Sequence, residues 1–173
     1  MNRFSLILSG ICLAAAPVSA ASASEIFGGL FVHDVKTPLN LSGVEGGADV
    51  QLGIRGARIG GTPLQPYGFV SVNTAGETHF AAAGVSAKFG RRFYIRPGIG
   101  LAVHSGSAGN FEVINDEVEF GSRVLFQPEL GIGMQVNDRL SVEASLVHLS
   151  HGTIFSGQNP GIDNIGVRLN FAF

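Results

Sequence analysis

The sequence predicts an all-β fold, an eight-stranded antiparallel transmembrane β-barrel. Three observations lead to this prediction. The chain after residue 20 divides into eight segments in which apolar and polar residues alternate, each about as long as a barrel strand. No apolar run in this part approaches the ~20 residues that a membrane-spanning helix needs. The composition, with 25 glycines, 13 phenylalanines and no tryptophan, is not typical of a helical protein.

Residues 1–20 have the pattern of a secretory signal peptide. Asn2-Arg3 supplies a short positive start, an apolar core follows over residues 6–16, and the segment ends on a small-residue cleavage site. Cleavage after Ala20 leaves residues 21–173, the length of a single domain. The only cysteine, Cys12, is removed with the signal, so the mature chain has no disulfide and no thiol chemistry.

The first four expected strands span residues 25–33, 48–56, 66–72 and 80–89. The second of them alternates an apolar face of Val50, Leu52 and Ile54 with a polar face of Asp49, Gln51 and Arg55. The fourth places five apolar side chains on one face: Ala81, Ala83, Val85, Ala87 and Phe89. The many glycines and alanines suit small inward-facing positions of a narrow barrel.

The last four expected strands span residues 93–104, 123–136, 139–150 and 164–173. The pattern is clearest in the first of these, whose apolar face comprises Phe93, Ile95, Pro97, Ile99, Leu101 and Val103. Pro97 and Pro128 argue against central strands of a soluble sheet, whereas a barrel can hold a proline at a bulge. The final strand ends on Phe173, which resembles the C-terminal aromatic residue common to outer-membrane barrels.

The faces opposite the apolar ones carry many charged side chains. The set expected to face inward comprises Arg55, Arg96, Arg123, Arg168, Asp49, Glu129 and Glu143. A soluble core would have to bury all of these charges with partners. The lumen of a barrel can pair them as a salt-bridged plug, while the apolar faces contact lipid. The pattern therefore favours lipid outside and charge inside.

Loop lengths predict how the barrel lies in the membrane. The connections at 89–93 and 136–140 are tight and that at 57–64 is moderate. They alternate with longer loops over 35–47, 73–79, 105–122 and 151–162. In bacterial barrels the short turns face the periplasm and the long loops lie outside. We therefore expect a multi-pass protein of the bacterial outer membrane, in contact with outer-membrane lipids.

The charge balance excludes some classes of partner. The formal net charge is −2, charged residues are 14% of the chain, and there is no basic run. A nucleic-acid partner is therefore not expected. His33, His79 and His104 do not share a metal-ligand spacing, so neither a metal nor another cofactor is expected.

Three chemically active residues share the apolar face of the last two expected strands. His148 and Ser150 lie two positions apart on one strand, ~6–7 Å between their alpha carbons. Asp163 enters on the same face from the adjacent antiparallel strand. A histidine at a barrel rim, considered alone, is usually just an interfacial residue. Polar groups of all three types on a lipid-facing surface are costly without a function, and together they are the parts of a nucleophilic triad.

This part of the chain resembles the family of outer-membrane lipid A 3-O-deacylases, the PagL family. The resemblance depends on His148-Leu-Ser150, Gly152, Asn159-Pro-Gly161-Ile-Asp163 and the final strand. It implies an eight-stranded barrel with a serine, histidine and acidic triad on its lipid-facing outer rim. The implied substrate is lipid A of lipopolysaccharide, from which an ester-linked acyl chain is hydrolysed by a serine esterase.

The resemblance also assigns further roles. Asn159 lies where family members place an asparagine that helps to form the oxyanion hole, and backbone amides around Gly152 are the other candidates. The family's acid is often glutamate, whereas Asp163 has a shorter side chain.

Two other interpretations remain at this point. The chain could be a small non-enzymatic structural or adhesive barrel of the outer membrane. It could also be an outer-membrane phospholipase, a type that carries a His-x-Ser pair but resembles a larger barrel of about twelve strands. The sequence does not decide the preferred acyl length, and it is compatible with a homodimer.

Overall fold

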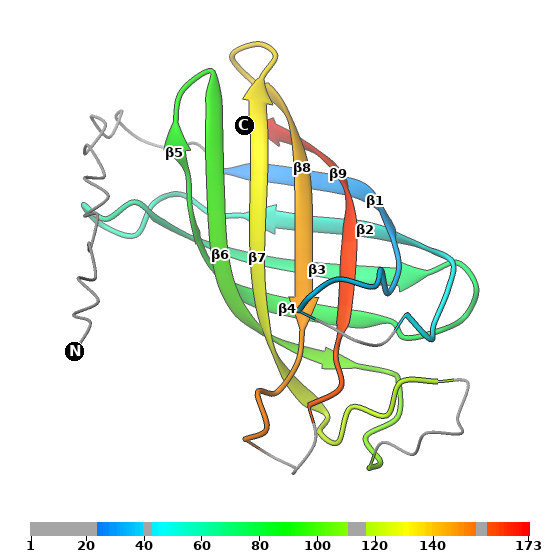
Figure 1. Ribbon diagram of the computed structural model, residues 1–173. Helices are drawn as coiled ribbons and strands as arrows, with labels where there is room; N and C mark the ends of the chain where they lie inside the picture. Colours follow the sequence, from blue (N-terminus) through cyan, green and yellow to red (C-terminus); the bar gives the residue numbers. More distant parts are fainter. Residues whose placement is uncertain (1–23, 40–42, 111–116, 155–158) are drawn as a thin grey trace, which may run out of the picture.

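The computed structural model describes residues 24–39, 43–110, 117–154 and 159–173. The signal peptide expected at 1–20 lies outside these residues. The described strands, labelled in Figure 1, are β1 (Glu25–Val32), β2 (Ala48–Arg55), β3 (Leu64–Asn73), β4 (Phe80–Ala87), β5 (Phe89–Gly90), β6 (Phe93–His104), β7 (Val124–Gln135), β8 (Leu140–Leu149) and β9 (Ile162–Ala172). Within the described residues, no helix is long and apolar enough to cross a membrane.

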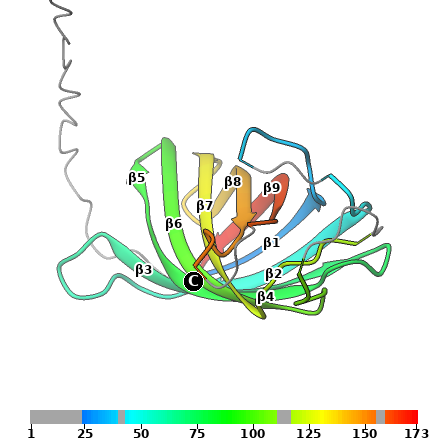
Figure 2. The same cartoon turned by 60° about the horizontal axis from the view of Figure 1, so that its bottom comes forward.

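The strands form one closed antiparallel sheet. Apart from β4 and β5, strands that are neighbours in the chain pair with each other. The first strand β1 also pairs with the last strand β9, and β4 pairs with β6. The two-residue β5 follows β4 and pairs with the same strand, β6. β4 and β5 therefore count together as one of the eight strands of the barrel. The eight-stranded antiparallel barrel expected from the sequence is confirmed, and its curved wall is seen in Figures 1 and 2.

The long connections gather at one end of the barrel, here called the outer end, which lies at the lower right of Figure 1. They link β1 to β2, β3 to β4, β6 to β7 and β8 to β9. The short turns lie at the opposite end, where they link β2 to β3, β5 to β6 and β7 to β8. This alternation of short and long connections is the one expected from the sequence.

The strand ends near the outer end differ in detail from the expectation. The last strand begins at Ile162 rather than at residue 164, because it pairs with β8 as far as Leu149. Asp163, expected to enter from this strand, lies within it as the second residue. Ser150 lies just beyond β8, where it forms an isolated antiparallel bridge with Phe126.

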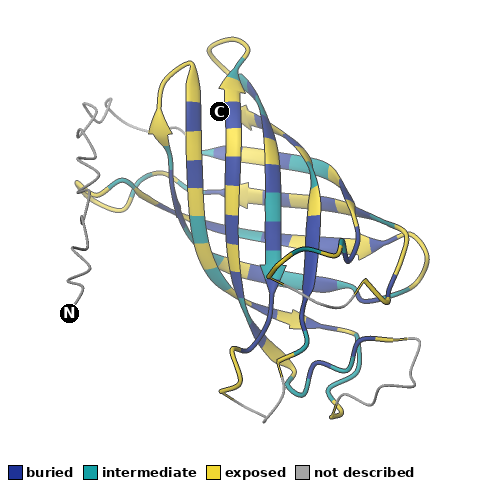
Figure 3. Ribbon diagram, in the orientation of Figure 1, coloured by how far each residue is buried: buried dark blue, intermediate teal, exposed yellow. Residues whose placement is uncertain are grey.

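The outer wall is apolar, as the alternation predicts. Buried residues alternate with exposed or intermediate ones along most of the strands, which Figure 3 shows as alternating bands of colour. The exposed apolar side chains include Leu30, Leu52, Ile54, Ile99, Leu101, Ile132, Val167 and Leu169. In water this surface would be a large exposed apolar patch, and in a bilayer it contacts the acyl chains.

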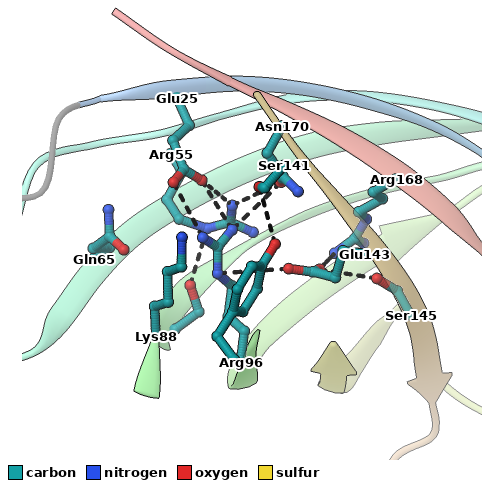
Figure 4. A network of polar contacts seen from close by, with 12 residues as sticks. Glu25, Arg55, Gln65, Lys88, Arg96, Ser141, Glu143, Ser145, Arg168 and Asn170 are labelled. Carbon is teal, nitrogen blue, oxygen red and sulfur yellow. Dashed lines mark hydrogen bonds and ion pairs between the residues drawn. The ribbon is translucent and has the colours of Figure 1, made fainter. Parts of the chain in front are cut away.

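The lumen holds a network of buried charges (Figure 4). Glu25 accepts hydrogen bonds from Arg55 Nη1 at 2.7 Å and from Arg96 Nη1 at 2.9 Å. Arg168 Nη1 donates to Glu129 Oε2 at 2.9 Å. All three guanidinium groups are buried, so these contacts replace the water that the charges lose. The expected salt-bridged plug is present.

Arg123 is an exception, because the expectation that it faces the lumen is wrong. It is exposed and lies one residue before β7, and its Nη1 donates to the carbonyl oxygen of Gly106 in the loop after β6. The alternation of faces holds only where the backbone is extended and paired. β7 begins only after Arg123, at Val124, so the alternation does not apply to Arg123.

Aromatic rings also lie in the lumen, beside the arginines, which the polar pattern did not predict. The Arg168 guanidinium carbon lies 5.0, 5.3 and 5.1 Å from the ring centroids of Phe27, Phe31 and Phe69, within cation–π range. Glycine makes room for these rings: a Cβ on Gly166 would collide with Phe31 and with the Leu30 carbonyl oxygen. The interior is therefore packed rather than open.

A second buried cluster lies under the long loops. The two ring nitrogens of His33 each lie 2.9 Å from a carboxylate, Glu45 and Asp49 respectively. Glu45 also accepts hydrogen bonds from the backbone amides of Thr78 and Val118. Burial lowers the pKa of His33, but the two neighbouring carboxylates outweigh it and raise the pKa to about 9. This cluster ties three of the four long connections together.

The His33 cluster predicts a loss of stability at alkaline pH. The pKa in the folded chain, about 9, exceeds the ordinary value of 6.5. The imidazolium therefore stabilises the fold fully below pH 6.5, and this contribution is lost as the pH rises through 9. The shift corresponds to at most about 3 kcal/mol. Thermal unfolding in detergent micelles, followed by heat-modifiable gel mobility, should show a lower midpoint above pH 9 than below pH 6.5.

His33→Gln serves as the control, because it removes the titrating group. The variant should unfold at a lower temperature than the wild type below pH 6.5 and should change less between the two pH values. An equal pH-dependent change in both proteins would contradict the assignment to His33.

Candidate active site

The β8–β9 register places His148 directly opposite Asp163 near the outer end of the barrel. His148 Nδ1 lies 2.7 Å from Asp163 Oδ1. The His148 side chain is 14% exposed, while Asp163 is fully buried. Both residues share the outward parity of Leu146 and Ile165, which are opposite each other in the next outward pair of the same two strands.

The position of Ser150 is set by β7 as well as by its own strand. Its backbone amide donates to the Phe126 carbonyl oxygen at 3.2 Å, and the Phe126 amide donates back to Ser150 at 2.7 Å. This bridge continues the β7–β8 pairing beyond the last residue of β8. Ser150 Oγ then lies 2.8 Å from His148 Nε2.

The three side chains form a linear chain of hydrogen bonds, from Ser150 through His148 to Asp163. A carboxylate at Nδ1 favours the tautomer that carries its proton there, because the carboxylate can only accept. Nε2 is then free to accept a proton from the serine hydroxyl. This arrangement can activate a hydroxyl for attack on an acyl carbonyl.

Thr37, which the sequence analysis did not identify, also contacts this group. Its Oγ1 donates a hydrogen bond to Asp163 Oδ2, the oxygen that does not face His148. Thr37 lies in the connection between β1 and β2, and 126 positions separate it from Asp163 in the chain. No local spacing or alternation could have indicated this contact. The pairing of the first and last strands brings the two residues together.

The two other expected site residues lie in the connection between β8 and β9. The Gly152 amide donates to Asn159 Oδ1 at 2.6 Å, and both residues are exposed. Gly152 has a φ of 61°, a left-handed conformation that glycine adopts without strain. This hydrogen bond occupies the Gly152 amide and orients the Asn159 side chain, leaving its Nδ2 group as the donor.

An apolar row lies next to the His148–Asp163 pair, on the side toward the middle of the barrel wall. Its members are paired across four adjacent strands: Leu130 with Leu146, Leu146 with Ile165, and Ile165 with Val32. Leu130, Ile165 and Val32 are 44%, 43% and 60% exposed. The polar group therefore borders a surface suited to hydrocarbon chains.

The part of the chain that the structure describes contains no group of three or more His, Cys, Asp or Glu side chains that could hold a metal ion.

Residues 44–172, more than half of the chain, match the family model described as lipid A 3-O-deacylase (PagL). The chain belongs to this family. Its members are enzymes that remove an acyl chain from lipid A, as the family resemblance implied. This membership supports lipid A as the substrate class and gives no support for a homodimer.

Solved structures agree on the fold. The outer-membrane enzyme PagL superimposes with a TM-score of 0.62 and 17% sequence identity, over 86% of this chain and 99% of that one. Neisserial surface protein A (NspA) gives a TM-score of 0.54 and 12% identity, over 90% of this chain and 100% of that one. Among curated protein sequences, none matches this chain. The chain is an outer-membrane β-barrel, as expected.

Proposed function

We propose that this chain is a lipid A 3-O-deacylase that uses Ser150, His148 and Asp163 as a catalytic triad. The observation that carries the proposal is the hydrogen-bonded chain of these three side chains on the outward face of the barrel. It occurs in a member of a deacylase family and beside an apolar surface. The geometry is that of a nucleophile, its base and the group that orients the base.

In the first half of the reaction, Ser150 Oγ attacks the ester carbonyl carbon of an acyl chain on lipid A. His148 Nε2 accepts the hydroxyl proton as the new carbon–oxygen bond forms. The tetrahedral intermediate then collapses, and the bond between the carbonyl carbon and the sugar oxygen breaks. His148 returns the proton to that oxygen, which leaves an acyl-enzyme and a free sugar hydroxyl.

In the second half, water attacks the acyl carbonyl and His148 accepts a proton from it. The bond to Ser150 Oγ breaks, the proton returns to the serine, and a fatty acid leaves. Asp163 keeps the histidine in the required tautomer and stabilises its charged form throughout.

In this proposal Asn159 and Gly152 have different roles at the oxyanion site. The Gly152 amide is engaged with Asn159 Oδ1, so it orients the asparagine rather than contacting substrate. The Nδ2 group of Asn159 is then the candidate donor to the oxyanion.

The position of the site suits a substrate held in a bilayer. The triad faces sideways at the outer end and borders the apolar row of Leu130, Leu146, Ile165 and Val32. Lipid A could thus present its ester without leaving the outer leaflet.

All three triad residues come from one chain, so the scheme needs no homodimer. We also propose that the signal peptide is cleaved after Ala20, so that the mature domain begins at residue 21.

The proposed activity is tested by incubating the purified barrel with lipopolysaccharide and detecting free hydroxy fatty acid by mass spectrometry. Release of hydroxy fatty acid is expected. Release of fatty acid from glycerophospholipid alone would indicate a phospholipase. No release from either lipid would indicate a non-enzymatic barrel.

Ser150→Ala should abolish deacylation without unfolding the barrel. Removing one member of a serine triad commonly costs several orders of magnitude in turnover, of order 10⁴ or more. The measurement is the initial rate of fatty-acid release in detergent micelles, with heat-modifiable gel mobility to confirm folding.

The matched control is Ser145→Ala, in β8, whose side chain faces the lumen and donates a hydrogen bond to Glu143. This control should retain its activity. Fatty-acid release by Ser150→Ala at the wild-type rate would rule out Ser150 as the nucleophile.

Asp163→Asn should lower turnover strongly, because the amide keeps the size of the side chain but loses the charge that stabilises the imidazolium. The corresponding change in serine proteases costs about 10⁴-fold. Asp163→Glu keeps the charge and should retain more activity than the asparagine variant. The same rate assay distinguishes them, with the exposed turn residue Asp138→Asn as control. Equal rates for wild type and Asp163→Asn would remove the acid from the mechanism.

A further inference from the structure

We propose that Thr37 is a positioning residue of this site, which holds the Asp163 carboxylate in the orientation that His148 requires. The proposal rests on the proposed function. It adds a fourth residue, contributed by the first long connection of the chain, to a site otherwise built from the last two strands.

The two oxygens of Asp163 have separate partners. Oδ1 lies 2.7 Å from His148 Nδ1, and Oδ2 accepts the hydroxyl proton of Thr37. A carboxylate with only one partner can rotate about its last bond and exchange its oxygens. With a donor on each oxygen, rotation breaks both hydrogen bonds, so the carboxylate stays aligned with the imidazole.

Burial makes the second donor necessary. Asp163 is fully buried, although it has the outward parity of Ile165, which is 43% exposed. A buried carboxylate oxygen without a partner would lose its hydration with nothing in return. The Thr37 hydroxyl supplies the partner that water supplies at exposed sites.

The backbone before Thr37 is fixed to β9, so the hydroxyl does not reach Asp163 by chance. The Val35 amide donates to the Asp163 carbonyl oxygen at 2.7 Å, and the Asp34 amide donates to Asn164 Oδ1 at 3.0 Å. Asp34 has a φ of 47°, which turns the chain back over the rim. In Figure 1 the segment that follows β1 runs back across β9 toward the end of β8.

The other end of the same connection holds this turn in place. The Asp34 carboxylate accepts hydrogen bonds from the backbone amides of Val44 and Glu45, at 2.8 and 3.1 Å. Beyond Thr37, the Leu39 amide donates to Thr37 Oγ1 at 3.0 Å, which orients the hydroxyl with its proton toward Asp163. The Thr37 hydroxyl thus both accepts and donates.

The test compares Thr37→Val, which keeps the shape and removes the hydroxyl, with Thr37→Ser, which keeps the hydroxyl. Thr37→Val should lower kcat for fatty-acid release about tenfold, the value of one hydrogen bond to a charged group, with KM unchanged. Thr37→Ser should restore most of kcat. The matched control is Thr62→Val. Like Thr37 Oγ1, Thr62 Oγ1 accepts a hydrogen bond from the backbone amide two residues later, that of Leu64, at 3.3 Å. Its own proton, however, is donated to the Ile59 carbonyl oxygen and not to a carboxylate.

A second readout does not depend on lipid A. A fluorophosphonate forms a phosphorus–oxygen bond to Ser150 Oγ as fluoride leaves and His148 accepts the serine proton, so the labelling rate reports how well the serine is activated. Thr37→Val should slow labelling about tenfold, Thr37→Ser should label near the wild-type rate, and Thr62→Val should match the wild type. In an Asp163→Asn background, Thr37→Val should add no further loss, because the carboxylate on which it acts is gone.

The outcomes separate the two proposals. Wild-type labelling of the Thr37→Val variant, or an equal further loss in the Asp163→Asn background, overturns the role of Thr37 and leaves the deacylase proposal standing. A wild-type chain that is labelled at Ser150 but releases no fatty acid overturns the proposed substrate, and the labelling series still decides the role of Thr37. A wild-type chain that the probe does not label overturns both.

Discussion

In hydrocarbon, every backbone amide and carbonyl must find a partner within the protein, and a closed antiparallel sheet meets this requirement with strands alone. The pairing of β1 with β9 and of β4 with β6 closes the sheet here. Closure then divides the side chains into those that face lipid and those that face the lumen. Both the packed interior of arginines and phenylalanines and the outward position of His148 follow from that division.

The register between β8 and β9 sets the positions of side chains on both the lipid-facing and the lumen-facing side of the barrel. The same pairing that sets His148 opposite Asp163 on the outside sets Glu143 opposite Arg168 on the inside. A slip of one residue would move every side chain of one strand to the other face. It would place Asp163 in the lumen and Arg168 in lipid, where an unpaired charge is costly. The buried Arg168–Glu129 ion pair therefore helps to keep the outer group of side chains aligned.

The parts that could be predicted from the sequence are those with a short repeat. Alternation over about ten residues indicates a barrel strand, and it placed His148, Ser150 and Asp163 on one face because all three lie in or beside such strands. Arg123 lies beyond a strand end, where alternation has no meaning. Thr37 and the rings around Arg168 depend on contacts between residues far apart in the chain, and such contacts leave no periodic pattern. The hydrogen bond from the Gly152 amide to Asn159 Oδ1 likewise depends on the geometry of the loop and leaves no pattern in the sequence.

The seam between the first and last strands has a consequence for the biogenesis of the barrel. Thr37 follows β1, the first strand to be made, and Asp163 is the second residue of β9, the last strand to be made. Their contact exists only after the two ends of the sheet have met and the first connection has crossed to the far side of the bilayer. A complete but only partly inserted chain therefore has His148, Ser150 and Asp163 in its sequence but not the finished environment of the carboxylate. The membrane that receives the chain is also where this carboxylate first acquires its second partner.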